Sequence, residues 1–176
     1  MPNTDGALDE TGFDALYRDC AKDVHGYALS LLGERAAAED VTALAFERLY
    51  RARLRLDRRR GTPRAWLFAI ARNAALDELR RRRHRPASGL DGEPGSDPAA
   101  GEAFDAVERR ATLRKALAAL TPREREVVLL KFHGQLSNSE LARALGVSES
   151  NAGTRLHRAL TRLRDVCGEL EQREVA

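Results

Sequence analysis

The sequence predicts an all-α protein, with two small helical domains joined by a flexible linker. Its 176 residues are rich in Ala, Leu, Arg and Glu, which favour helix, and contain few β-branched runs. Apolar residues recur at three- and four-residue spacing. Residues rich in Gly, Pro and Asp interrupt this pattern and have almost nothing to bury. We therefore expect a disordered tail (1–9), a domain (10–85), an acidic linker (86–103), a domain that ends in a helix-turn-helix (104–170) and a tail (171–176).

Two helices open the first predicted domain. The first covers residues 10–32 and ends at Gly33, and the second covers about residues 35–53. Phe46 and Tyr50 lie partly outside the apolar stripe of the second helix. We interpret them as extra core against a third helix, and a protein-binding surface is the alternative.

A basic loop and a third helix complete this domain. Residues 54–61 (LRLDRRRG) break the helical pattern. Thr62 and Pro63 then form a helix start, an N-cap followed by proline at the first helical position, and this helix runs to about residue 83. Trp66, the only tryptophan, is expected in the core, and stacking on an exposed base is the alternative.

Charge is segregated along the chain, although the net charge is only +3. Basic residues gather in 51–60, in 80–85 and in the last helix, which fits contact with phosphates. A single stretch of basic residues is more commonly a solvated surface than a binding site. Positive charge at the C-terminus of a helix, as in residues 80–85, is also stabilising without any phosphate contact. Fully extended, about 16 linker residues reach roughly 55 Å, enough to hold two domains on separate sites of one duplex.

The second predicted domain begins with a helix over residues 104–120. Residues 121–124 (TPRE) form a capping box with proline at the first helical position, and the helix that follows stops before Gly134. Four helices with short connections can then close a small core of their own. Its expected members are Leu117, Val128, Leu141, Leu145, Val147 and Leu156.

Residues 137–164 predict two helices joined by a tight turn. Ser137 and Glu140 form a capping box, Gly146 supplies the turn, and Ser148 caps the second helix. This is a helix-turn-helix whose second helix can read base edges in a DNA major groove; a helical hairpin with a solvated basic face is the alternative. The outward face of the second helix carries Ser150, Asn151, Thr154, Arg155, Arg158 and Arg162.

Several classes of site have no sequence support. Cys20 and Cys167 form no disulfide framework or metal motif, and both are expected to be small buried residues. No nucleotide loop, catalytic triad or metal-ligand spacing occurs, so we expect no catalytic residue, no cofactor and no metal. No stretch has the apolar character of a signal peptide or a membrane span, and we expect a cytoplasmic protein.

Three stretches carry a family resemblance. Residues 38–41 (AEDV) with 46–50 (FERLY) are similar to a helix that binds core RNA polymerase. Residues 60–82, from RGTPRAWL to LDELRRR, are similar to a segment that melts and reads the −10 promoter element. Residues 120–159, from LTPRERE to RLHRA, are similar to a domain that reads the −35 element. Because these three stretches occur in this order and spacing, the chain resembles the extracytoplasmic-function (ECF) group of RNA polymerase sigma factors.

The resemblance implies a non-enzymatic sigma factor that binds core RNA polymerase (its β′ and β subunits), recognises promoter DNA and promotes its melting. An anti-sigma protein is a further expected partner. The implied polymerase-binding residues are Glu39, Asp40, Phe46, Glu47 and Tyr50. The implied −10 contacts lie in the loop and third helix: Arg58, Arg59, Arg60, Arg64, Trp66, Asn73, Asp77, Arg80 and Arg81. For the −35 element, His157 joins the six residues given above.

Two departures and two alternatives accompany the resemblance. Ala43-Leu44 stand where many relatives have a polar pair, and Ala152-Gly153 stand where many have valine and lysine. Glycine inside a helix costs about 1 kcal/mol relative to alanine. The first alternative is a conventional helix-turn-helix repressor or activator with an N-terminal dimerisation domain. The second is a helical interaction protein that binds an acidic partner.

Overall fold

The computed structural model describes residues 8–84 and 104–175, and the regular structure in these ranges is helical throughout. The all-α prediction is therefore confirmed. The expected linker lies outside the described residues. Two 3₁₀ turns, Arg53–Arg55 and Arg58–Arg60, form the basic loop. The α-helices are α1 (Glu10–Leu32), α2 (Arg35–Ala52), α3 (Pro63–His84), α4 (Phe104–Ala119), α5 (Pro122–Gly134), α6 (Asn138–Leu145) and α7 (Glu149–Val175).

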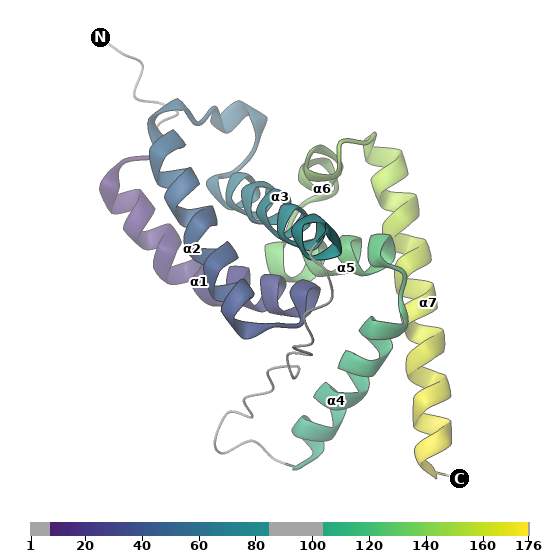
Figure 1. Ribbon diagram of the computed structural model, residues 1–176. Helices are drawn as coiled ribbons and strands as arrows, with labels where there is room; N and C mark the ends of the chain where they lie inside the picture. Colours follow the sequence, from purple (N-terminus) through teal and green to yellow (C-terminus); the bar gives the residue numbers. More distant parts are fainter. Residues whose placement is uncertain (1–7, 85–103, 176) are drawn as a thin grey trace.

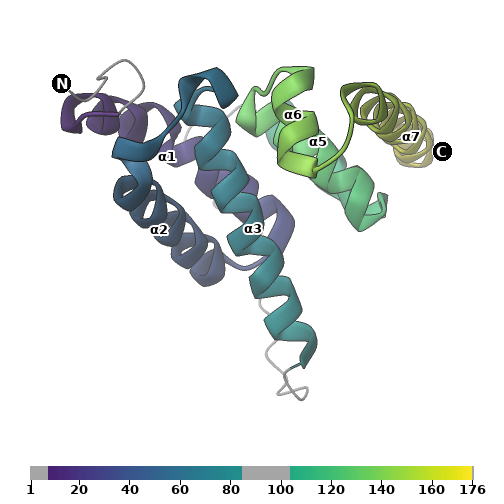
Figure 2. The same cartoon turned by 90° about the horizontal axis from the view of Figure 1, so that it is seen from above.

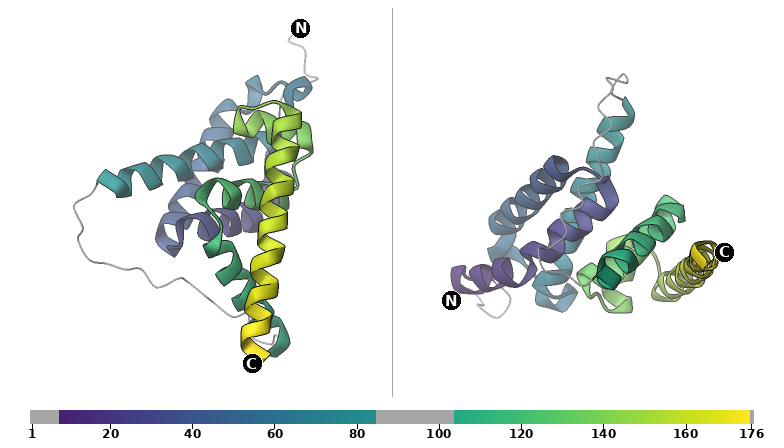
Figure 3. Two further views of the ribbon diagram at one scale, coloured as in Figure 1. Left: turned by 90° about the vertical axis from the view of Figure 1, so that its right-hand side faces the viewer. Right: turned by 90° about the horizontal axis from the view of Figure 1, so that it is seen from below.

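The helices from the two ends of the chain pack together (Figure 1). Helices α1, α2 and α3 contact one another, and α5 and α6 lie against the side of this group formed by α1 and α3. Seen from above, α3 runs between α2 and the α5–α6 pair, with α7 outermost (Figure 2). Helix α4 packs along the C-terminal part of α7, away from α3 (Figure 3).

The start of α1 shows that two residues of the expected tail belong to the fold. Leu8 is buried, and its N–H donates to the carbonyl of Arg53 at 2.9 Å. Asp9 is the N-cap, because its Oδ1 accepts a hydrogen bond from the N–H of Gly12 at 2.8 Å. At the other end, Gly33 has φ 71°, the left-handed conformation that ends a helix.

The main hydrophobic cluster includes residues from both predicted domains. Tyr27, Leu49 and Leu67 from the first half are fully buried in the same cluster as Leu130 and Leu141 from the second. The expectation of a separate core for the second half therefore needs correction. Of its six expected members, Leu141, Leu145, Val147 and Leu156 join the main cluster, Val128 lies in a small second one, and Leu117 contacts both. The sequence pattern also missed Phe68, a buried residue of α3.

Helix α7 is longer than expected. It continues to Val175, so residues 171–175, expected as a tail, are helical. Earlier along the same helix, Leu160 and Leu163 belong to the second hydrophobic cluster, together with buried Leu120 and Ala159. The expected burial of the cysteines holds for Cys20, which is 1% exposed, whereas Cys167 on α7 is half-buried.

Candidate nucleic-acid and polymerase interface

The predicted helix-turn-helix is formed by α6 and α7. Ser137 and Glu140 make the predicted capping box: the Ser137 hydroxyl accepts from the N–H of Glu140, and the Glu140 carboxylate accepts from the N–H of Ser137. Gly146 has φ 66°, and its N–H closes the end of α6. Ser148 Oγ accepts from the N–H of Asn151 at the start of α7. The caps and the turn of the motif are confirmed.

The outward face of α7 carries the predicted −35 residues. All seven are exposed, while Ala152 and Ala159 on the opposite side of the helix are fully buried. The Thr154 hydroxyl donates back to the carbonyl of Ser150 at 3.0 Å. Arg162 lies near the start of α5, with its Nε 3.9 Å from Glu124. The N-terminal half of α7 therefore presents a polar, cationic face, formed by Ser150, Asn151, Thr154, Arg155, His157 and Arg158.

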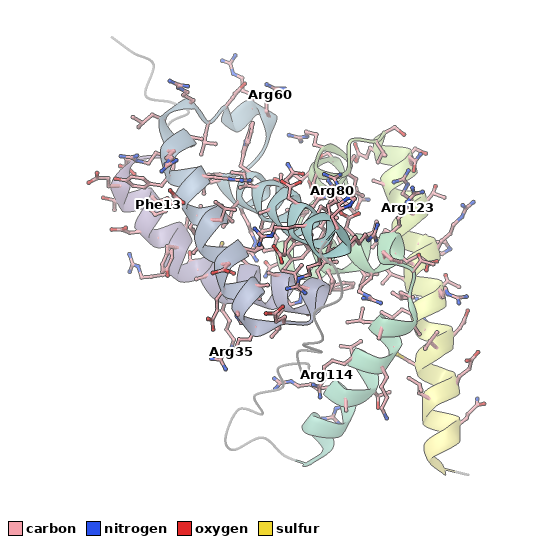
Figure 4. All side chains as sticks on the ribbon, in the orientation of Figure 1. Phe13, Arg35, Arg60, Arg80, Arg114 and Arg123 are labelled. Atoms are coloured by element: carbon pink, nitrogen blue, oxygen red, sulfur yellow. The ribbon has the colours of Figure 1, made fainter. Side chains whose placement is uncertain are left out.

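The predicted −10 residues do not share one environment. Arg59 and Arg60 on the loop before α3 are exposed, and Figure 4 shows where Arg60 lies. On α3, Arg80 pairs with Asp77 at 3.1 Å and Arg81 pairs with Glu78. Exposed positions on α3 include Asn73, Asp77, Arg80 and Arg81. The side chain of Arg58 lies outside what the structure describes.

Two of the predicted −10 residues lie against other parts of the molecule. Trp66 is half-buried, and its Nε1–H has no hydrogen-bond partner. The guanidinium of Arg64 donates to the carbonyls of His133 and Gly134 at 2.7 Å each, and to Asp23 at 2.5 Å. In this arrangement Arg64 joins α3 to α1 and α5. Its assignment to DNA stays a prediction.

The predicted polymerase-binding residues lie on α2. Phe46 is buried, as the core interpretation expected, but its aromatic partners are Phe13, which it meets edge-on, and Tyr17, both of the first helix and not of the third. Tyr50 is 39% exposed, packs edge-on against Phe13 and carries the Arg53 guanidinium 3.7 Å above its ring.

The carboxylates of this set are exposed. Glu39 pairs with Arg35 at 3.0 Å and Glu47 pairs with Arg51 at 2.6 Å, both within α2. Asp40 lines a groove of about 300 Å³ between α2 and α3, together with Asp77 and Arg81 of the predicted −10 set. The structure thus brings residues from two predicted functional sets to one groove.

Sequence analysis missed the contacts that connect the two halves. Glu140 Oε1 accepts from the N–H and the hydroxyl of Thr62 at 3.2 and 2.7 Å. Burial raises the pKa of Glu140, but the hydrogen bonds from Thr62 and Ser137 outweigh it, so the pKa lies below its usual value. Arg143 donates to the carbonyl of Arg60.

A buried ion pair also crosses between the halves. Arg72 Nε of α3 lies 2.8 Å from Glu126 Oε1 of α5, with side chains 18% and 11% exposed. The two groups are close but not aligned as a hydrogen bond, so their attraction is that of two charges in contact. Their neighbour Tyr27 is buried with an unpartnered hydroxyl, and burial raises its pKa.

The described residues hold neither a metal site nor a membrane-spanning helix. No group of His, Cys, Asp and Glu there can hold a metal ion. Over the same part of the chain, no helix combines the length and apolar character needed to cross a bilayer. What the described residues offer is a capped helix-turn-helix with a cationic face and a second basic surface at the start of α3. These features define a DNA-binding protein.

Comparison with known proteins identifies the family. Residues 16–85 match the family model Sigma-70 region 2, and residues 110–163 match Sigma-70, region 4. The chain is 34% identical to the RNA polymerase sigma factor CarQ of Myxococcus xanthus, over 95% of this chain and 94% of CarQ. It is 32% identical to the ECF RNA polymerase sigma factor SigL of Mycobacterium tuberculosis, over 89% of each chain. The chain belongs to the ECF family of RNA polymerase sigma factors.

Solved structures share the fold. The sigma factor RpoE of Bartonella quintana, determined with the anti-sigma factor NepR, is 23% identical with a TM-score of 0.71, over 88% of this chain and 95% of that one. CnrH, determined with the cytosolic domain of CnrY, is 24% identical with a TM-score of 0.66, over 92% and 90%. The protein is thus a sigma factor that acts in transcription initiation, and a conventional repressor or activator is not favoured.

Proposed function

We propose that the exposed face of α7 reads the −35 element, that the loop before α3 and the exposed face of α3 engage the −10 element, and that α2 binds core RNA polymerase. One observation carries this assignment. All seven residues predicted from sequence for −35 contact lie on the exposed side of α7, next to a turn with the predicted caps. Side chains in this position can enter a major groove, and their cations can contact phosphates on its edges.

The family supports the rest of the proposal. The polymerase carries out the chemistry, and this chain supplies promoter recognition and helps to open the duplex without catalytic residues of its own. It acts in the cytoplasm, where the bacterial polymerase works. An anti-sigma protein is a proposed partner, because solved structures of the same fold contain such proteins.

Reconstitution with bacterial core RNA polymerase tests this function. We expect transcription from promoters of the host only when this protein and core polymerase are both present. Polymerase binding is followed separately by gel filtration, with Glu47→Lys on α2 as a variant that weakens it. Specific DNA binding by the free protein without core-dependent initiation would contradict the proposal and support a conventional repressor.

A further inference from the structure

Helices α3 and α5 begin with the same three residues but differ at the fourth. Residues 121–124 are TPRE, and residues 62–65 are TPRA. In α5, Glu124 accepts from the N–H and the hydroxyl of Thr121 at 2.9 and 2.8 Å, which completes a capping box. Ala65 has no acceptor to offer at the corresponding position of α3. Helix α3 therefore lacks a capping carboxylate of its own.

The missing carboxylate comes from the other half of the molecule. Glu140 Oε1 accepts from the N–H and the hydroxyl of Thr62, as Glu124 does for Thr121. Its Oε2 accepts from the N–H of Ser137 at 3.0 Å. One carboxylate thus lies at the N-termini of two helices, α3 and α6, where the helix dipoles favour negative charge. This is a capping box shared between elements 78 residues apart.

Arg64 makes the complementary contact at a helix C-terminus. Its guanidinium binds the last carbonyls of α5, those of His133 and Gly134, where a helix leaves acceptors unpaired. A positive charge is also favoured there by the helix dipole. Arg143 of α6 donates to the carbonyl of Arg60 on the loop before α3. Charged side chains therefore join the ends of α3, α5 and α6.

We propose that Thr62, Arg64, Glu140 and Arg143 form a latch that holds this sigma factor in a closed, inactive conformation, and that the latch must open before the protein loads on a promoter. The proposal rests on the promoter contacts proposed above. The latch uses residues of the segment assigned to the −10 element, because it engages Arg64 and the Arg60 carbonyl. Trp66 and Arg60 also share a pocket of about 260 Å³ with Glu140 and Arg143 of α6.

Distance gives a second reason why the closed form cannot load. Thr62 contacts Glu140, and about 18 residues separate Glu140 from Arg158, half of them in α7, so the start of α3 lies within about 45 Å of Arg158. Arg81, at the far end of the −10 set, lies about 28 Å further along α3, so even this residue is within about 75 Å of Arg158. Promoter elements centred near −10 and −35 are about 25 base pairs apart, or about 85 Å at 3.4 Å per step. The closed molecule cannot reach both.

The test compares two variants that both lose the capping box of α6. Glu140→Ala removes that box and the link to Thr62, whereas Ser137→Ala removes the Ser137 hydroxyl and keeps the link. Small-angle X-ray scattering of each purified full chain reports closure; a compact chain of this length has a radius of gyration of about 16 Å. We expect Glu140→Ala to raise this radius and the maximum dimension, and Ser137→Ala to leave both unchanged.

The regulatory part is tested by titrating each variant into core polymerase and measuring transcription. Because a closed form lowers the competent fraction, Glu140→Ala is expected to lower the half-saturating concentration about tenfold relative to Ser137→Ala. Equal scattering of the two variants would overturn the latch. An opened Glu140→Ala with an unchanged half-saturating concentration would overturn its inhibitory role. Failure of the wild type to bind core polymerase would count against the proposed function, while the scattering still reports the latch.

A second variant opens the latch without loss of a cap. Ala65→Glu places a carboxylate at the third position of α3, where it competes with Glu140 for Thr62 and gives α3 the TPRE sequence of α5. Ala65 is buried and lines the pocket beside Glu140, so Ala65→Leu, which adds similar bulk without a carboxylate, is the control and is expected to stay compact. For Ala65→Glu we expect wild-type helix content by circular dichroism together with the scattering of Glu140→Ala. A compact Ala65→Glu that keeps its helices would contradict the shared capping box.

Discussion

At the scale of single residues, the effect of a substitution depends on the space around the residue and on its backbone conformation. Gly153 lies inside α7, and a Cβ at this position would meet nothing within 4 Å. Gly146 also has open space around it, but its φ of 66° is one that side chains rarely adopt. The same chemical change at the two positions must therefore have opposite consequences.

Gly153→Ala is expected to increase the free energy of unfolding by about 1 kcal/mol, because alanine is the better helix former and no atom obstructs it. Urea denaturation measures the change, and Gly146→Ala is the control, expected to be destabilising. If Gly153→Ala stabilises the fold yet reduces −35-dependent transcription, then DNA approaches the backbone at this glycine. A loss of stability would show that the helix needs glycine there.

The histidine at the junction of α1 and α5 makes the folded state sensitive to pH. Burial lowers the pKa of His133, and Asp23 opposes this effect only in part. The ring packs so closely that a Cβ on Gly26 would lie 3.0 Å from its Cε1, and Arg64 binds its carbonyl. The unfolded chain therefore takes up a proton more readily than the folded one as the pH falls below about 6.5.

It follows that the stabilisation from neutral His133 is fully present above about pH 6.5 and is lost as the pH falls through the folded-state pKa. We expect the free energy of unfolding to fall between pH 7.5 and 5.5, and to fall less in His133→Gln. Urea titrations at both pH values measure this, with His157→Gln on the exposed face of α7 as the control. If the free energy of unfolding falls equally in the wild type and in His133→Gln, then His133 is not the source of the pH dependence. Glu140 acts in a separate, more acidic range, because its pKa is lowered from an already acidic value.

At the scale of elements, capping decides where helices begin and which ones meet. Helices α5 and α6 each have a complete capping box within their own sequence. Helix α3 completes its box with Glu140 from α6, so the start of α3 depends on the rest of the fold. Helix α7 starts with a Ser148 cap and presents its cationic face beside that cap.

The proposed role of α7 predicts distinct effects for its cations. Arg155→Ala or Arg158→Ala is expected to weaken −35-dependent initiation, because a bidentate contact to a base is worth roughly 1 to 3 kcal/mol, about five- to 150-fold. Transcription from promoters with intact and scrambled −35 elements measures this. Arg164→Ala, an exposed residue later on the same helix, is the control with little expected effect. Full activity of both Arg155→Ala and Arg158→Ala would remove this surface from the −35 assignment.

At the scale of the whole molecule, the two sequence regions that match separate family models pack into one body. Their apolar residues form one main cluster, and the Arg72–Glu126 pair and the latch connect them. The predicted division into two domains describes the sequence regions. Whether the two regions unfold together depends on the core that they share.

A shared core predicts one cooperative unfolding transition for the wild type. We expect calorimetry to give a single peak whose calorimetric and van't Hoff enthalpies agree. Glu140→Ala, by weakening the connection, is expected to broaden or divide the transition. Two transitions in the wild type would mean that the halves are thermodynamically independent despite their contacts.

The sequence by itself determined the local structure and the family of this protein. Helical periodicity and caps at Thr62, Ser137 and Gly146 are signals between residues a few positions apart, so they predicted the helices and the exposed face of α7. Periodicity was a weaker guide where many alanines make one helix face as buried as another, and there it missed Phe68.

Only the tertiary structure decided how the halves meet. The sequence assigned Arg64 to the −10 element and Glu140 to a local capping box, but their partners in the other half lie 70 and 78 positions away along the chain. A sequence pattern records local spacing but carries no direct signal of such distant contacts. One local clue existed: TPRA at the start of α3 lacks the carboxylate that TPRE has in α5. The fold supplies that carboxylate because packing of the shared core brings the N-terminus of α6 to the N-terminus of α3.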